Sequence, residues 1–277
     1  MKKYLKLECK RIAHEKRLWI ALAVGLFVSV LHWALYVLPI RKYLSEFEGK
    51  GIGTIYPHTW YEKWIGGEWW TLLSYVFFII IPLLAAVPWG SSLHSDRKNS
   101  YTKNLFVKGK KSYYYISKYI CSFLCGGVTV ITPLIVNILL SAATLPSLTP
   151  QAVTGTSTIF ANCMWSKLFY TAPNLYVLFY LVIIFTYSGL FSVLATVMGA
   201  VTESGFVALV FPFIVNLFAY IIFNSAESAK FVPFMFLTPA QRSGEATDFT
   251  VIVIEALVLF VITALLMTVS CKKDETL

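Results

Sequence analysis

Residues 173–200 read PNLYVLFYLVIIFTYSGLFSVLATVMGA, a stretch without one charged side chain. Because about 20 apolar residues in a helix cross the hydrocarbon core of a bilayer, this stretch predicts a transmembrane helix. Five more stretches are similarly long and apolar, and they occupy residues 18–40, 70–91, 115–142, 205–223 and 250–270. The sequence therefore predicts an all-α integral membrane protein in which residues 1–277 form a single domain with six transmembrane helices.

The composition of the whole chain supports a membrane class over a soluble one. Hydrophobic residues make up 57% of the 277 positions and charged residues only 13%, whereas soluble domains carry about 25% charged residues. The net charge of +9 does not indicate nucleic-acid binding, because the basic residues lie beside the apolar stretches, where they determine topology and contact lipid head groups. We therefore expect the lipid bilayer, and no nucleic acid, as a partner.

The placement of Lys and Arg also predicts the orientation of the chain. With both termini in the cytoplasm, most of the 23 basic residues fall on the cytoplasmic side, as the positive-inside rule requires. Residues 1–17 have apolar side chains at helical spacing among basic ones, which predicts a helix on the membrane surface. A basic arm that only fixes the topology is an equal alternative. The short turn around residues 202–204 leaves open whether spans four and five are separate.

The longest cytoplasmic connection predicted by this topology is the loop at 92–114, between spans two and three. The sequence from 92 to 118 is SLHSDRKNSYTKNLFVKGKKSYYYISK, in which residues 99–107 favour a short helix. That helix would present Tyr101, Leu105 and Phe106. Exposed aromatic and apolar side chains in a basic loop indicate contact with a partner protein or with lipid.

Four motifs resemble those of the permease subunits of ABC transporters of the ABC-2 type. They are MKKYLKLECKRIAHEKR before the first span, SDRKNS after the second, KGKKSYYYISKYI before the third and FLTPA before the last. The similarity covers nearly the whole chain through loose patterns. One departure is Asn99, which occupies a position where this family often has a small residue, and no glycine follows until Gly109.

The resemblance implies a dimeric exporter in the cell membrane, here predicted to be a bacterial plasma membrane. The partners it implies are a second permease, identical or homologous, and cytoplasmic ATP-binding cassette ATPases that hold ATP and Mg. The implied cargo is a hydrophobic or amphipathic molecule such as a drug, a lipid or an antimicrobial peptide. The contacts that would couple the ATPases to the permease are Asp96, Arg97, Tyr101, Leu105, Phe106 and Glu203.

Polar residues inside the predicted spans are candidates for a translocation path, because burying them in lipid is unfavourable. These residues are Asn137, Asn216 and Glu255. Two positions are open for Glu255, facing the protein interior or reaching the outer interface. The two asparagines favour hydrogen bonds between helices.

No catalytic, cofactor-binding or metal-binding pattern is present in this sequence. The phosphate-loop motif GxxxxGK[ST] is absent, and the four histidines and five cysteines show none of the spacings of a metal site. We therefore expect a transporter subunit and no enzyme. The alternatives are an intramembrane enzyme, an ion-coupled secondary transporter and a regulatory membrane subunit; the first two usually need several ionisable groups within the spans.

Overall fold

The computed structural model describes residues 1–41, 58–68, 70–102, 110–155, 157–225, 228–241 and 247–273, and every regular element in these ranges is helical. Three short helical turns, η1 (Trp33–Val37), η2 (Ala152–Thr154) and η3 (Ala229–Phe231), accompany the α-helices. The α-helices are α1 (Lys2–His14), α2 (Lys16–His32), α4 (Trp60–Lys63), α5 (Leu72–Ala86), α6 (Ser92–Lys98), α8 (Lys111–Thr144), α9 (Ser166–Thr171), α10 (Pro173–Val201), α11 (Gly205–Ser225), α12 (Pro233–Phe236) and α13 (Phe249–Lys273).

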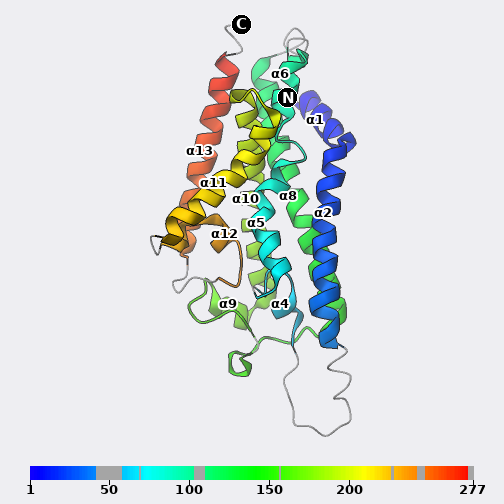
Figure 1. The fold of residues 1–277 in the computed structure, drawn as a ribbon, viewed down its shortest axis with the longest axis vertical. Coiled ribbons are helices and arrows are strands. Elements are labelled where there is room, and N and C mark those ends of the chain that lie inside the picture. Colours follow the sequence, from blue (N-terminus) through cyan, green and yellow to red (C-terminus); the bar gives the residue numbers. More distant parts are fainter. Residues whose placement is uncertain are drawn as a thin grey trace.

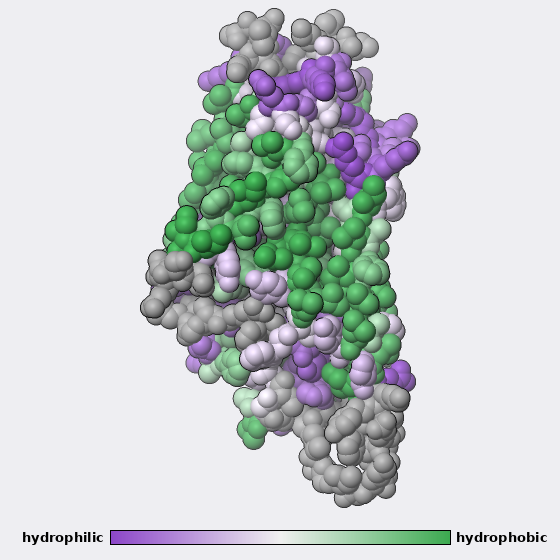
Figure 2. Space-filling model, in the orientation of Figure 1, coloured by the Kyte–Doolittle hydropathy of each residue, from purple (hydrophilic) through white to green (hydrophobic). Residues whose placement is uncertain are grey.

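Within the described residues, five helices are long and apolar enough to cross a membrane, as expected for a multi-pass membrane protein. They cover Lys16–Arg41, Lys111–Thr144, Pro173–Val201, Gly205–Phe223 and Phe249–Lys272. Figure 2 shows hydrophobic residues over the middle of the molecule and hydrophilic residues at the end that carries α1 and α6. The prediction of an all-α membrane protein is confirmed at this level.

The second predicted span, residues 70–91, is shorter than expected. Its helix α5 has 15 residues, or about 22 Å at 1.5 Å per residue, against a hydrocarbon thickness of about 30 Å. Pro82 lies inside α5 without ending it. The helix instead gives way to turns at 87–91, where Pro88 lacks the N–H that an α-helix requires and Trp89 and Gly90 precede α6.

Helix α10 lies at the centre of the bundle, where α5, α8, α11 and α13 pack around it (Figure 1). Small and hydroxyl-bearing residues allow α8 and α10 to approach closely. Ser122 Oγ lies 3.0 Å from Ser192 Oγ and 2.7 Å from Thr196 Oγ1, and Gly126 faces the same helix with no room for a side chain. Such contacts bring transmembrane helices together when lipid supplies no hydrophobic driving force.

A break at Glu15 separates the N-terminal helix from the first span. Glu15 has an extended backbone with φ −76° and ψ 119°, so α1 leaves the axis of α2 and lies at one end of the bundle (Figure 1). The last turns of α13 lie at that same end. A short separate helix within residues 1–17 is thereby confirmed.

One other sequence prediction is resolved by the fold. Spans four and five are separate helices, because α10 ends at Val201 and α11 begins at Gly205. Between α11 and α13, η3 and α12 form short helices, and the Phe234 and Phe236 side chains of α12 are buried. Protein therefore covers this irregular segment, as non-helical backbone at membrane depth would require.

Candidate functional site

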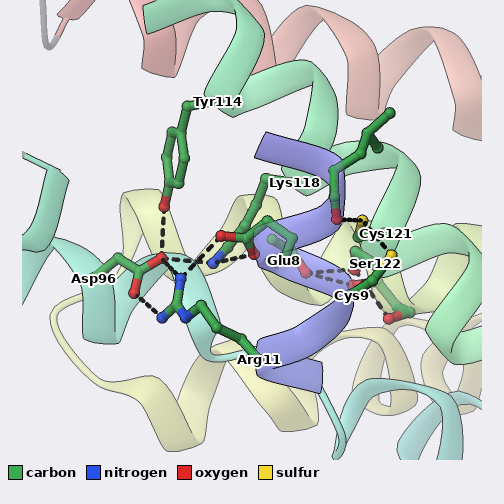
Figure 3. Close-up of polar contacts among 11 residues, drawn as sticks. Glu8, Cys9, Arg11, Asp96, Tyr114, Lys118, Cys121 and Ser122 are labelled. Atoms are coloured by element: carbon green, nitrogen blue, oxygen red, sulfur yellow. Dashed lines mark hydrogen bonds and ion pairs between the residues drawn. The ribbon is translucent and has the colours of Figure 1, made fainter. Parts of the chain in front are cut away.

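A cluster of charges, buried except for the partly exposed Arg11, joins three helices at the end of the bundle where α1 lies. Glu8 and Arg11 come from α1, Asp96 from α6, and Lys118 from the second turn of α8 (Figure 3). Two acids and two bases balance one another, so the cluster carries no net charge. The first and the last of these four residues, Glu8 and Lys118, are more than 100 positions apart in the sequence. All four side chains nevertheless lie together in the folded chain.

Asp96 is the centre of the cluster. Its side chain is almost fully buried and accepts four hydrogen bonds. Arg11 donates through Nη2 to Oδ1 at 2.5 Å and through Nη1 to Oδ2 at 3.1 Å. Tyr114 Oη and Lys118 Nζ each donate to Oδ2 at 2.6 Å. The two-pronged geometry of Arg11 fixes the orientation of the carboxylate.

The remaining contacts close the cluster. Lys118 has no exposed surface, and its Nζ lies 3.1 Å from Glu8 Oε2 and 4.7 Å from the centre of the Trp89 ring. Arg11 Nη1 also donates to Glu8 Oε1 at 2.9 Å. The Trp89 ring therefore shields the Lys118 ammonium group from solvent. Excluding water strengthens the attraction between Lys118 and its acidic partners.

Local sequence explains why these side chains face one another. Glu8 and Arg11 are three positions apart on α1, and Tyr114 and Lys118 are four positions apart on α8; both spacings put the two side chains on one helix face. Asp96 lies in the last turn of α6 beside its neighbours Arg97 and Lys98. Helices α1 and α8 thus each present a prearranged pair of side chains to Asp96 of α6.

The cluster shifts the pKa of Asp96 and of Arg11. Burial alone raises the pKa of Asp96, but the hydrogen bond from Arg11 and the charge of Lys118 outweigh it, so the pKa lies below its ordinary value of 3.8. Burial alone would lower the pKa of Arg11, but the hydrogen bond and the charge of Asp96 raise it by more. The pKa of Arg11 therefore lies above its ordinary value. The ion pair is thus fully charged at neutral pH.

Arg97 extends the connection to two more helices. Its Nη1 donates to the carbonyl of Ala200 at 2.6 Å, and its Nη2 donates to Tyr115 Oη and to the carbonyl of Ser270, both at 3.3 Å. A cation at the carbonyl end of a helix is favourable because it meets the negative end of the helix dipole. Helix α6 is therefore tied to α1 and α8 through Asp96, and to α10 and α13 through Arg97.

The four predicted coupling residues that the structure describes fall into three groups. Asp96 and Arg97 point into the protein and hold helices together. Tyr101 is partly exposed, with its ring 4.6 Å from the guanidinium of Arg11. Glu203 is exposed in the turn between α10 and α11.

Leu105 and Phe106, with most of the predicted helix at 99–107, lie outside the residues that the structure describes. Within that range, Asn99 follows the end of α6, and Ser100 has a left-handed backbone with φ 53°. Tyr101 and Thr102 are helical again. Ser100 thus makes the sharp change of direction that a glycine would make at lower cost.

The three candidate path residues are not in one place. Asn137 bridges helices as predicted, since its Oδ1 accepts from the backbone N–H of Ile65 and its Nδ2 donates to the carbonyl of Ser29, both at 2.8 Å. Asn216 and Glu255 instead line one groove between α11 and α13. Of the two positions left open for Glu255, the one toward the protein is found.

Sequence reasoning missed Glu8, Arg11, Tyr114 and Lys118 as site residues. A signal for Lys118 was present, because it lies beyond the start of the predicted third span at 115, and a base inside a span needs an acidic partner. The spacing of Glu8 and Arg11 was equally visible. Among the described residues, no group of three or more His, Cys, Asp or Glu side chains can hold a metal ion.

Comparison with known proteins gives no relative for this chain. No family model, no curated protein and no solved structure matches it.

Proposed function

We propose that this chain is the membrane-spanning permease subunit of an ATP-binding cassette exporter of the ABC-2 type. The observation that carries the proposal is the buried cluster around Asp96, which anchors both ends of the segment between α5 and α8. Asp96 fixes the start of that segment, and Lys118 and Tyr114 fix its return into α8. A force applied to the segment would reach the transmembrane helices through these contacts.

The proposed mechanism starts at the predicted coupling helix, residues 99–107. A partner ATPase that closes on ATP would press on this helix, and Asp96 and Arg97 would carry the displacement into α1, α8, α10 and α13. Because Asp96 and Lys118 are buried and paired with each other, removing either partner costs several kcal/mol. The helices at this end would therefore move together and not separately.

The proposed topology has six spans with both termini in the cytoplasm. In this arrangement α5 and the turns at 87–91 form the second span, and α1 lies on the cytoplasmic membrane surface. Support comes from the basic residues near α1 and α6, and from the location of α1 and the end of α13 at one end of the bundle (Figure 1). The proposed location is the plasma membrane of a bacterium.

The proposed complex contains a second permease and two ATPase chains that hold ATP and Mg. The sequence has no phosphate loop of its own, which supports hydrolysis on a partner chain. A hydrophobic or amphipathic substrate fits the groove between α11 and α13, whose lining residues are apolar apart from Asn216 and Glu255.

Co-purification with an ATP-binding cassette ATPase encoded beside this chain tests the proposal. The doubly substituted variant Leu105→Asp/Phe106→Asp should lose assembly and the stimulation of ATP hydrolysis, because two charges replace the apolar side chains predicted to enter the ATPase. Val153→Asp is the matched control, since Val153 is 98% exposed at the opposite end of the bundle.

Two outcomes would refute the proposal. One is unchanged assembly and unchanged ATPase stimulation in the Leu105→Asp/Phe106→Asp variant. The other is the absence of any stable complex between the unmodified chain and the neighbouring ATPase. Equal loss in the Val153→Asp control would assign the effect to misfolding and would also remove support for the coupling helix.

A further inference from the structure

A groove of about 490 Å³ lies between α11 and α13, with residues of α10 also lining it. Both helices lie at the edge of the bundle (Figure 1). The volume falls in the range of about 300–1,000 Å³ that is typical of small-molecule sites. Among the described residues that line it, Asn216 and Glu255 alone are polar.

Both polar side chains have acceptor atoms without a partner. Asn216 is only 5% exposed, and its Oδ1 is buried with no hydrogen bond to any described residue. Glu255 is half-buried, and no described Lys, Arg or His forms an ion pair with it. A buried acceptor and a carboxylate in apolar surroundings are both unfavourable unless a donor or a cation meets them.

The depth of these groups limits what can meet them. Glu255 is six residues from the start of α13 and Asn216 nine residues from the end of α11, or about 9 Å and 14 Å along the helices at 1.5 Å per residue. Both distances are longer than one helical turn of about 5.4 Å. The two acceptors therefore lie deep enough to be surrounded by apolar side chains. A ligand must therefore bring its donor into an apolar environment.

We propose that this groove binds an amphipathic primary amine. The ammonium group donates hydrogen bonds to the Glu255 carboxylate and to Asn216 Oδ1, and the hydrocarbon part lies against the apolar walls. An anion is repelled by Glu255, an alcohol brings no charge, and a quaternary ammonium has no N–H for Asn216. The inference deepens the proposed function, because it gives the class of substrate that the permease takes from the membrane.

Equilibrium binding of radiolabelled dodecylamine to the full chain in phosphatidylcholine nanodiscs tests this inference. Unlabelled dodecyltrimethylammonium, dodecanol and dodecanoate, which share the same chain, serve as competitors. We expect dodecylamine to compete best, and Glu255→Gln and Asn216→Leu each to raise Kd by about tenfold or more. Asp248→Asn is the control, because it removes an exposed charge just before the same helix.

Three results would overturn the inference. They are an unchanged Kd in Glu255→Gln, an equal rise in Asp248→Asn, and competition by dodecanol as strong as that by dodecylamine. If the variants do not fold, a diazirine-bearing dodecylamine is used on the unmodified chain. Photolabelled peptides must then come from α11 and α13, and labelling only elsewhere contradicts the site.

The assay contains no ATPase, so the two proposals fail separately. Amine binding with no ATPase partner would leave the groove assignment intact and remove the exporter function. Conversely, ATPase coupling without amine binding would remove only the groove assignment.

Discussion

The buried pair of Asp96 and Lys118 allows a quantitative prediction about stability. Asp96 is 2% exposed and Lys118 is fully buried, with Nζ 2.6 Å from Oδ2. Asp96→Asn leaves Lys118 with Glu8 as its remaining acidic partner, at 3.1 Å, and gives the cluster a net positive charge. Removing one partner of a buried pair costs about 3–5 kcal/mol of unfolding free energy.

The double variant distinguishes pairing from general damage. Lys118→Met alone leaves two acids opposite Arg11, and we expect a similar cost of about 3–5 kcal/mol. In Asp96→Asn/Lys118→Met, the pair of Arg11 and Glu8 at 2.9 Å remains balanced. The double variant should therefore be more stable than the sum of the single effects predicts, with an interaction energy of about 2–3 kcal/mol.

Unfolding in mixed micelles with increasing dodecyl sulfate, followed by tryptophan fluorescence, measures these free energies. If the two single effects add to within about 0.5 kcal/mol, Asp96 and Lys118 are not energetically coupled. That result would contradict the shared charge network. Single effects below about 1 kcal/mol would have the same consequence, since they are typical of exposed ion pairs.

Three further predictions concern the same end of the molecule and its packing. The folded-state pKa of Asp96 lies below 3.8, so its contribution to stability is complete above about pH 4 and is lost as pH falls further. Unfolding free energies measured between pH 5 and pH 3 should show this loss. The Asp96→Asn variant should lack this pH dependence. Cys9 and Cys121 have sulfur atoms 3.7 Å apart, so mild oxidation with diamide should link α1 to α8, as mass spectrometry of the joined peptides would show; absence of that peptide contradicts the docking of α1. Gly126→Ala places a Cβ 2.7 Å from a backbone oxygen of α10 and should destabilise the chain by about 1–3 kcal/mol, whereas Val128→Ala, at a position 51% exposed, should change it by less than about 0.5 kcal/mol.

The long apolar helices were largely predictable because their limits depend on local sequence. Pro173 opens α10 at a position that needs no N–H, and the polar residues after Val201 end it. The predicted limits of 173–200 are thus within one residue of the observed helix. The second span was overestimated because its apolar run includes Pro88 and Gly90, and hydropathy alone does not register that the helix stops before them.

The charge cluster was not predictable in the same way. Asp96 pairs with Arg11 and Lys118 across 85 and 22 residues, and no periodicity connects these positions. The loop residues looked free to bind a partner, but the folded chain uses two of them to hold its own helices. Likewise, the sequence left two positions open for Glu255 and favoured an interhelical hydrogen bond for Asn216, and only the rotation of α11 and α13 about their axes places both side chains in one groove.

ATP-dependent uptake into inside-out proteoliposomes tests whether the chain transports amphipathic amines as part of an ATP-binding cassette exporter. Purified chain is reconstituted with and without the neighbouring ATP-binding cassette ATPase, and accumulation of a fluorescent amphipathic amine is followed over time. We predict that accumulation requires both proteins and hydrolysable ATP. We also predict that accumulation is lost in the Leu105→Asp/Phe106→Asp variant. Accumulation by the chain alone, driven by an imposed proton or sodium gradient, would contradict these predictions.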